Sequence, residues 1–240
     1  MEFSNVYQDA QRAAAYDTLE YPGTYYLAFR DLPRIFREYV VGNRALDFGC
    51  GTGRSSRYLK SLGFDVVGVD IAEEMLERAR SRDPQGDYRL VSGQDLAGVE
   101  RSSFDLILSA FTFDNIPTME RKVSLFSQLA GSLRPAGRIV SVVSSPELYR
   151  HDWASFKCTP FAGNLSARAG DSVYTVMLDV GDDRPVHDIL WPDDAYRETY
   201  RRAGLQVLET HRPLADGTES IRWVNETTVA PWTIYVLSRM

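Results

Sequence analysis

Cysteine and histidine are scarce in this chain of 240 residues, which contains 2 cysteines and 3 histidines. Two cysteines cannot build a disulfide framework, and three scattered histidines predict no metal site. The sequence has no run of about 18 apolar residues, which argues against a membrane-spanning helix. It also lacks a basic surplus, because 27 Lys and Arg stand against 33 Asp and Glu for a net charge of −6. We therefore expect neither a nucleic-acid nor a membrane partner.

The beginning of the chain has no basic segment followed by an apolar one, so we predict no signal peptide and a cytoplasmic protein. Its hydrophobic content of 44% and charged content of 25% are typical of globular proteins. No repeat or Pro/Gly/Ser-rich linker divides it. We therefore expect one domain over 1–240, divided into an N-terminal helical segment at 1–40, a core at 41–145, an insertion at 146–203 and closing strands at 204–240.

Short apolar runs alternate with helical patterns from Arg44 to about Val143. Strands are predicted at 45–49, 64–70, 87–93, 104–110 and 138–144, and helices at 5–18, 24–39, 54–62, 72–82 and 120–133. Strands that alternate with helices imply right-handed crossovers and a mostly parallel sheet, so the fold class is α/β. The later segments predict an antiparallel hairpin at 171–179 and 185–191, a helix at 192–203, and strands at 204–212 and 229–239.

A glycine-rich loop follows the first predicted strand of this core. It contains Gly49, Gly51 and Gly53, and the acidic Asp47 precedes it. Glycines let the backbone turn sharply and approach a ligand closely. Asp70 ends the next strand, about 20 residues later, where nucleotide-binding folds hold a ribose diol. The spacing G-x-G-x-G differs from the dinucleotide pattern, and an acid before the loop suits a ligand that carries an ammonium group.

The string ALDFGCGTGRSSRYLKSLGFDVVGVDIAEEMLERAR at 45–80 resembles motifs I and II of class I S-adenosylmethionine-dependent methyltransferases. The resemblance implies a Rossmann-like fold: a mostly parallel seven-stranded sheet with helices on both faces, an N-terminal helical lid and a small antiparallel insertion. It implies S-adenosyl-L-methionine as the cofactor and S-adenosyl-L-homocysteine as the product. By position, the resemblance implies cofactor contacts from Arg30, Asp47, Gly49, Cys50, Gly51, Gly53, Asp70, Ile71, Asp95, Leu96 and Ser109. Among these, Cys50 is expected to be a small filler between glycines. Arg30 could equally lie on the surface or contact the methionine carboxylate of the cofactor.

The segment after the fourth predicted strand excludes several acceptor classes. The chain has Ser-Ala-Phe-Thr at 109–112 where DNA amino-methyltransferases carry a Pro-Pro dipeptide, and no double-glutamate loop for arginine is visible. Asp114 alone is poor evidence for a metal-assisted catechol site. A small organic acceptor remains.

The candidate acceptor contacts are aromatic and amide side chains. The N-terminal segment resembles the lids of small-molecule methyltransferases, which close over an active site and exclude water. Asn115 stands where many relatives have histidines and offers a donor and an acceptor to a ring edge. Tyr7 and Asn115 are therefore the candidate catalytic residues. The candidate acceptor contacts are Tyr7, Tyr16, Tyr21, Asn115, Trp191, Trp223 and Asn225; core packing is an equally good explanation for any single tyrosine or tryptophan.

Three further segments, at 144–161, 184–196 and 223–237, resemble a subgroup that contains the azapteridine N-methyltransferase of toxoflavin biosynthesis. This resemblance implies two successive methylations of ring nitrogens in a small heteroaromatic substrate. An acidic ring N–H needs little help to lose its proton, which fits the lack of an obvious catalytic histidine. Alternatives are an aminosugar amine, a phenolic oxygen, or a non-catalytic module that kept the cofactor pocket. The sequence leaves the oligomeric state open between monomer and homodimer.

Overall fold

The computed structural model describes residues 17 and 20–240. The N-terminal helix expected at 5–18, and with it the candidate residues Tyr7 and Tyr16, lies outside these described residues except for Asp17.

A seven-stranded sheet forms the centre of the described chain, in the order β3-β2-β1-β4-β5-β10-β9. Its strands are β1 (Arg44–Phe48), β2 (Asp65–Asp70), β3 (Asp87–Leu90), β4 (Phe104–Ala110), β5 (Leu133–Ser144), β9 (Leu205–His211) and β10 (Trp232–Arg239). β10 runs antiparallel to both neighbours, and the pairs among β1 to β5 are parallel. The predicted mostly parallel α/β sheet is therefore confirmed.

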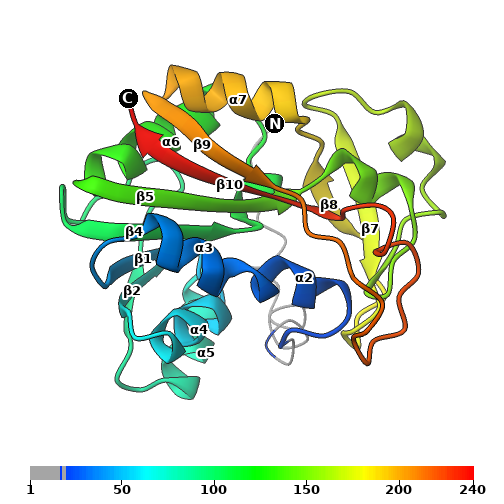
Figure 1. The fold of residues 1–240 in the computed structure, drawn as a ribbon, viewed down its shortest axis with the longest axis horizontal. Helices are drawn as coiled ribbons and strands as arrows, with labels where there is room; N and C mark the ends of the chain where they lie inside the picture. Colours follow the sequence, from blue (N-terminus) through cyan, green and yellow to red (C-terminus); the bar gives the residue numbers. More distant parts are fainter. Residues whose placement is uncertain (1–16, 18–19) are drawn as a thin grey trace.

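Helices cover both faces of this sheet (Figure 1). They are α2 (Thr24–Arg30), α3 (Leu32–Tyr39), α4 (Arg54–Ser61), α5 (Glu73–Arg82), α6 (Met119–Ser132) and α7 (Asp193–Arg202). The blue-to-cyan helices α2 to α5 lie on one side, and α6 and α7 lie on the other. The single helix expected at 24–39 is in fact two, since α3 begins with Pro33 in its first turn. A proline there cannot continue the preceding helix, because it has no N–H and its ring collides with the previous turn.

The buried apolar residues form one large cluster on each face of the sheet. Alternate residues of β4 supply both clusters: Leu106 and Leu108 pack on the face of α2 and α3, and Ile107 packs on the face of α6 and α7. Successive side chains of a strand point to opposite faces, so a strand covered on both sides is apolar throughout. This explains why FDLILSA reads as one continuous hydrophobic run.

The insertion forms a separate three-stranded antiparallel sheet of β6 (Phe156–Lys157), β7 (Ser172–Met177) and β8 (Val186–Ile189). The predicted hairpin is confirmed by the pairing of β7 with β8, in which Thr175 lies opposite Val186. The small sheet stands at the edge of the molecule to which β5 and β10 lead (Figure 1). β8 contacts the short helix η2 (Thr112–Asn115), which follows β4. The insertion therefore reaches the carboxyl end of the central strands.

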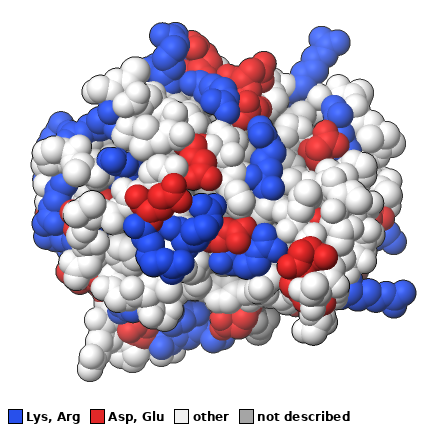
Figure 2. Space-filling model, viewed as in Figure 1, with Lys and Arg blue, Asp and Glu red and all other residues white. Residues whose placement is uncertain are grey.

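Basic and acidic side chains are interspersed on the face shown in Figure 2. Oppositely charged side chains also pair along single helices: on α7, Arg197 pairs with Asp193 at 2.8 Å and Arg201 pairs with Glu198 at 2.8 Å. None of the helices in the described part of the chain is both long enough and apolar enough to span a membrane.

Candidate functional site

The glycine-rich loop lies between β1 and α4 and forms one wall of a cavity of about 140 Å³. Gly49 and Gly51 line this first cavity, and their φ angles of 74° and 52° lie in the left-handed region. A Cβ on Gly49 would stand 2.1 Å from Oγ1 of Thr112, so no larger residue fits there. Glycine is thus required twice over, by the backbone angle and by the close approach of the loop that follows β4.

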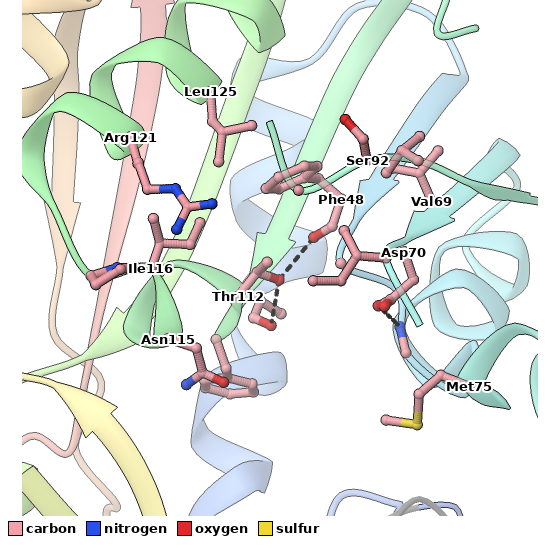
Figure 3. Close-up of a pocket in the computed structure, with 18 residues that line it drawn as sticks. Phe48, Val69, Asp70, Met75, Ser92, Thr112, Asn115, Ile116, Arg121 and Leu125 are labelled. Atoms are coloured by element: carbon pink, nitrogen blue, oxygen red, sulfur yellow. Dashed lines mark hydrogen bonds between the residues drawn. The ribbon is translucent and has the colours of Figure 1, made fainter. Parts of the chain in front are cut away.

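Asp70 ends β2 beside the glycine loop and also lines the first cavity (Figure 3). Its Oδ2 accepts a hydrogen bond from the Gly51 N–H at 2.8 Å, and its Oδ1 accepts one from the Ala72 N–H at 2.9 Å. Burial raises the pKa of this carboxyl, and the backbone donors oppose that rise. A carboxylate can accept about four hydrogen bonds, so Asp70 is fixed in place and retains capacity for two neighbouring hydroxyls.

The remainder of the first cavity is mainly apolar. Its full lining is Phe48, Gly49, Gly51, Val69, Asp70, Ile71, Met75, Val91, Ser92, Gly93, Ala110, Phe111, Thr112, Asn115, Ile116, Pro117, Arg121 and Leu125. Ile71 and Met75 follow Asp70 along the chain, and Figure 3 shows Ser92, Val69 and Leu125 on the far side from Asn115. A mainly apolar cavity with one carboxylate in its lining suits an adenosine with an extension toward Asn115.

Asp47 is fully buried one residue before the cavity wall. Its Oδ2 accepts hydrogen bonds from the hydroxyls of Ser55 at 2.7 Å and Ser56 at 2.6 Å, which ties β1 to the first turn of α4. Burial raises its pKa to about 6. Its Oδ1 has no hydrogen-bond partner in the described chain. Asp47 does not line the cavity itself, but it leaves one buried acceptor for a donor that reaches under the loop.

Other predicted cofactor contacts lie elsewhere, for identifiable reasons. The Cys50 side chain points away from the cavity and packs with Leu76, Ala79 and Tyr88. Burial raises its thiol pKa well above the usual value, so it is an unreactive filler. Gly53 is close to Tyr88, whose hydroxyl would be 2.7 Å from an added Cβ, and does not line the cavity.

Arg30 is placed on the surface side of α2 rather than at the cavity. Its guanidinium donates to Asp31 at 2.9 Å, to Glu219 at 3.1 Å and to the Leu214 carbonyl at 3.0 Å. These partners hold it away from the glycine loop. The structure therefore assigns Arg30 to the attachment of α2 to the loop after β9.

The segment after β3 differs from the expectation as well. Asp95 is exposed and its Oδ1 accepts the Ala97 N–H at 3.1 Å, while the Leu96 N–H donates to Oε1 of Gln128 at 2.9 Å. Ser92 and Gly93 line the cavity in their place. Likewise Ser109 is buried without a partner for its hydroxyl, and its neighbour Ala110 faces the cavity.

A second, smaller cavity of about 40 Å³ adjoins the first, and Phe111 and Asn115 line both. Its full lining is Tyr25, Phe111, Asp114, Asn115, Ser144, Leu148, Phe156, Thr175, Met177, Val186, Asp188 and Trp232. Phe111 has a φ of 65°, which is strained for a residue with a side chain. Strain of this kind persists where the surroundings enforce it, often at functional sites. The strained residue here separates the two cavities.

Two buried carboxyls line the second cavity, and one buried ammonium lies near them. Asp188 accepts hydrogen bonds from Nδ2 of Asn115 at 2.5 Å and from the Tyr149 hydroxyl at 3.0 Å. Asp114 accepts from the Ser144 hydroxyl at 2.8 Å. Lys122 on α6 is fully buried and donates to the Phe113 carbonyl.

Burial shifts the pKa values of all three groups toward neutrality. It raises the pKa of Asp114 to about 7 and that of Asp188 to about 6, and it lowers the pKa of Lys122 to about 7. Repulsion from Asp188 also raises the pKa of Asp114, whereas Lys122 favours the charged forms of both carboxyls. Clustered groups with pKa values near 7 beside a cavity are typical of functional sites.

Of the described residues that we predicted to contact the acceptor, only Asn115 lines a cavity. Tyr21 packs on Phe29 and donates its hydroxyl to the Arg54 carbonyl at 3.0 Å. Trp191 belongs to the core on the α6 side and donates from Nε1 to Thr199 at 3.3 Å.

Trp223 and Asn225 lie in the loop before β10 and are engaged with neighbours. Trp223 donates from Nε1 to Glu219 at 3.1 Å, and Asn225 donates from Nδ2 to the Asp152 carbonyl at 2.8 Å. Both contacts hold loops together. Neither side chain lines a cavity.

Sequence reasoning missed residues that line the second cavity, above all Asp188 and Trp232, and the Tyr149 hydroxyl that donates to Asp188. One signal was present: Asp188 is the only carboxyl in the strand VHDI, where alternation places it on the same side as the apolar Val186. A carboxyl on the buried face of a strand needs partners or a ligand. Among the described residues, no three His, Cys, Asp or Glu side chains gather closely enough to hold a metal ion.

Comparison with known proteins shows what this arrangement resembles. Residues 46–141 match a protein family described as "Methyltransferase domain". The fold is that of class I S-adenosylmethionine-dependent methyltransferases. A putative S-adenosylmethionine-dependent methyltransferase from Listeria monocytogenes superposes with a TM-score of 0.64 at 18% identity, over 90% of this chain and 99% of that one. One from Clostridium acetobutylicum superposes with a TM-score of 0.66 at 15% identity, over 98% and 96% of the two chains.

Sequence relatives of this chain include a ubiquinone biosynthesis O-methyltransferase from Xanthomonas oryzae pv. oryzae, which is 32% identical over 104 residues. A protein of the same name from Xanthomonas campestris pv. campestris is 32% identical over 107 residues. The alignments cover 42% and 43% of this chain, and 42% and 44% of the relatives. The chain thus spans less than half the length of the curated relatives that it matches. The segment that matches the methyltransferase family, residues 46–141, is the part of the chain that contains the glycine loop.

Proposed function

We propose that this chain is an S-adenosylmethionine-dependent methyltransferase with a small heteroaromatic acceptor. The observation that carries the proposal is the placement of Asp70. This carboxylate accepts hydrogen bonds from two backbone N–H groups, one of them Gly51 of the glycine loop, and keeps acceptor capacity toward the cavity that it lines. When bound, S-adenosylmethionine supplies an electrophilic methyl group on a sulfonium sulfur.

The residues of the first cavity have distinct roles in this proposal. Asp70 accepts the two ribose hydroxyls, and Ile71 packs against the adenine with the apolar lining around it. Gly49 and Gly51 allow the methionine portion to approach the backbone. The unpartnered Oδ1 of Asp47 suits the ammonium group, either directly or through water. The methyl group is then directed toward Phe111 and Asn115, where the cavities adjoin.

The acceptor in this proposal occupies the second cavity. The three segments that resemble the azapteridine N-methyltransferase subgroup converge there: Leu148 and Phe156 come from 144–161, Asp188 from 184–196 and Trp232 from 223–237. This convergence supports successive methylation of ring nitrogens in an azapteridine. The ring would be held in line with the sulfonium carbon, and alignment of this kind supplies much of the rate of methyl transfer.

A phenolic oxygen acceptor is the second candidate, because the Xanthomonas relatives are named as O-methyltransferases. Their similarity extends over 104 to 107 residues, less than half of this chain. Incubation with neutral N–H heterocycles and with catechols, followed by mass spectrometry of the products, separates the two.

Calorimetry with S-adenosylmethionine tests the proposal at Asp70. Asp70→Ala should weaken binding by about 1–3 kcal/mol, the range for loss of charge-assisted hydrogen bonds. Asp65→Ala is the matched control, since Asp65 is an exposed carboxyl at the other end of β2. Unchanged affinity in a folded Asp70→Ala variant would overturn the assignment. Measurable formation of S-adenosylhomocysteine would exclude a non-catalytic binding module.

A further inference from the structure

The second cavity has an unusual balance of charge. Two carboxyls, Asp114 and Asp188, are among its lining residues, and its described lining includes no lysine, arginine or histidine. The nearby ammonium of Lys122 is directed to the Phe113 carbonyl and lies 5.0 Å from the Trp191 ring centroid and 5.4 Å from that of Tyr196. An anionic ligand in this cavity would therefore meet carboxylates without a facing cation, which opposes its binding in a buried site.

The two carboxyls differ in their freedom to bind a ligand. Asp114 accepts hydrogen bonds from the Ser144 N–H at 3.0 Å, the Ser144 hydroxyl at 2.8 Å and the Tyr196 hydroxyl at 3.2 Å. Each oxygen of Asp188 accepts a single hydrogen bond, from Asn115 or from Tyr149. Since a carboxylate can accept about four, Asp188 is oriented by its partners and still able to accept a donor from the cavity.

Aromatic rings form the walls around this carboxyl. Phe111 and Trp232 lie 4.7 Å apart between ring centroids, and Tyr25 is stacked on Trp232 at 5.8 Å. Phe156 packs on Tyr25 at 5.0 Å. Aromatic walls with one oriented acceptor at the base favour a flat ring whose edge carries a hydrogen-bond donor. The volume of about 40 Å³ admits such an edge, while the rest of the ring extends toward the first cavity.

We infer that Asp188 is the residue that selects the acceptor: its ionised carboxylate accepts an N–H from the edge of a neutral, flat nitrogen heterocycle and thereby turns another ring atom toward the first cavity. This inference rests on the proposed function and adds a substrate class to it. The same site disfavours acceptors that carry a carboxylate or phosphate. Asn115 takes part by holding Oδ1 of Asp188 with its Nδ2.

Titratable groups from several elements lie near Asp188 or across the second cavity from it. These are Asp114 on η2, Lys122 on α6, Tyr149 on η3 (Pro146–Arg150), Cys158 after β6, and Tyr25 of α2 across the cavity. Burial raises the pKa of Asp188 to about 6, and the Tyr149 hydroxyl opposes this rise. Binding of an N–H donor should therefore strengthen as the pH rises through about 6.

The test is calorimetric titration of the full-length protein, saturated with S-adenosylhomocysteine, with three probes: lumazine as a neutral N–H heterocycle, catechol as a neutral phenol and 3,4-dihydroxybenzoate as an anionic one. We expect lumazine to bind most tightly. Asp188→Asn should weaken lumazine by about ten- to a hundredfold, the range for loss of a charge-assisted hydrogen bond. Asp179→Asn is the matched control, because Asp179 is an exposed carboxyl of the same insertion.

Tyr149→Phe provides a second, milder variant that keeps the carboxyl. It removes one hydrogen bond to Asp188, so the pH at which lumazine binding strengthens should move upward. Unchanged lumazine affinity in folded Asp188→Asn, or tighter binding of 3,4-dihydroxybenzoate than of lumazine, would overturn the inference. Failure of S-adenosylhomocysteine itself to bind would instead refute the proposed function, so the two failures are distinguishable.

Discussion

Nδ2 of Asn115 donates a hydrogen bond to Oδ1 of Asp188 at 2.5 Å, and so joins the loop after β4 to the small sheet of the insertion. Asn115 lines both cavities, whereas Asp188 lines only the second. This contact therefore connects the segment at 46–141, which matches a methyltransferase family, with the insertion. The first and second cavities adjoin at Asn115, so substitutions can change ligand binding in one cavity without changing it in the other.

Replacement of Asn115 separates the two sites. Asn115→Ala removes the hydrogen bond that orients Asp188 but leaves Asp70 and the glycine loop intact. S-adenosylmethionine affinity should stay near wild type, and the affinity for lumazine should fall by about tenfold, since one hydrogen bond to a charged group is lost. Calorimetry with each ligand measures both. Asn225→Ala is the control, because that amide bonds the Asp152 carbonyl away from the cavities. Loss of S-adenosylmethionine binding alone would show that Asn115 belongs to the cofactor site.

The pH dependence of stability reports the burial of Asp188. Its pKa is raised from 3.8 to about 6 by burial, so the folded protein holds this proton more tightly than the unfolded chain. The resulting stabilisation is fully present below pH 3.8 and is lost as the pH rises through about 6. The asparagine in Asp188→Asn does not titrate, so the variant does not lose this stabilisation as the pH rises. Urea unfolding from pH 4 to pH 7 should therefore show the variant gaining stability relative to wild type as the pH rises.

A difference between the two proteins that does not change with pH would contradict this interpretation. Asp114, whose pKa is raised to about 7 by burial and by Asp188, contributes a dependence of the same sign. Asp179→Asn, which keeps both Asp114 and Asp188, is therefore the control, and its stability should depend on pH as that of the wild type does.

The glycine loop can be tested with a pair of substitutions. Gly49→Ala and Gly63→Ala both place alanine at a positive φ, 74° and 90°, and share a strain of about 1–2 kcal/mol. Only at Gly49 would the new Cβ collide, with Oγ1 of Thr112 at 2.1 Å. Gly49→Ala should therefore lower the melting temperature more and weaken S-adenosylmethionine binding. Equal effects of the two substitutions would mean that the loop tolerates a side chain at the cavity.

Replacement of Arg30 tests whether this residue binds the cofactor, as the family resemblance implies, or serves only in the ion pairs that the structure shows. The expectation gives it the methionine carboxylate, whereas the structure pairs it with Asp31 and Glu219. Arg30→Ala should leave S-adenosylmethionine affinity within about twofold and cost stability only modestly, as is usual for partly exposed ion pairs. Calorimetry with S-adenosylmethionine measures the affinity. A tenfold loss in a folded variant would show that Arg30 contacts the cofactor after all.

The sequence was sufficient to predict the fold because its central signals are local. Strand runs such as FDLILSA and the glycine loop between strand and helix depend on residues close together in the chain. The break between α2 and α3 was not predicted, because the apolar residues of the two helices form one continuous helical pattern. Pro33, which lies in the first turn of α3, was the signal for the break. The pairing of β7 with β8 was predicted from the turn residues between them.

The candidate site was only partly predictable. Asp70 lies where its motif places it, because a short loop and one strand fix its position. The second cavity instead joins Tyr25, Asp188 and Trp232, which lie far apart in the sequence and are brought together only by tertiary packing. A local sequence pattern cannot predict that such distant residues line one cavity. Aromatic residues such as Trp191 and Tyr21 looked equally suitable, and the structure uses them for the core and for helix packing.

A crystal structure with S-adenosylhomocysteine bound tests the central claim most directly. We predict that both ribose hydroxyls lie within hydrogen-bond distance of the Asp70 carboxylate, and that the sulfur faces Phe111 and Asn115, where the first cavity adjoins the second. A ligand bound elsewhere, or one in this cavity whose ribose makes no contact with Asp70, would contradict the account.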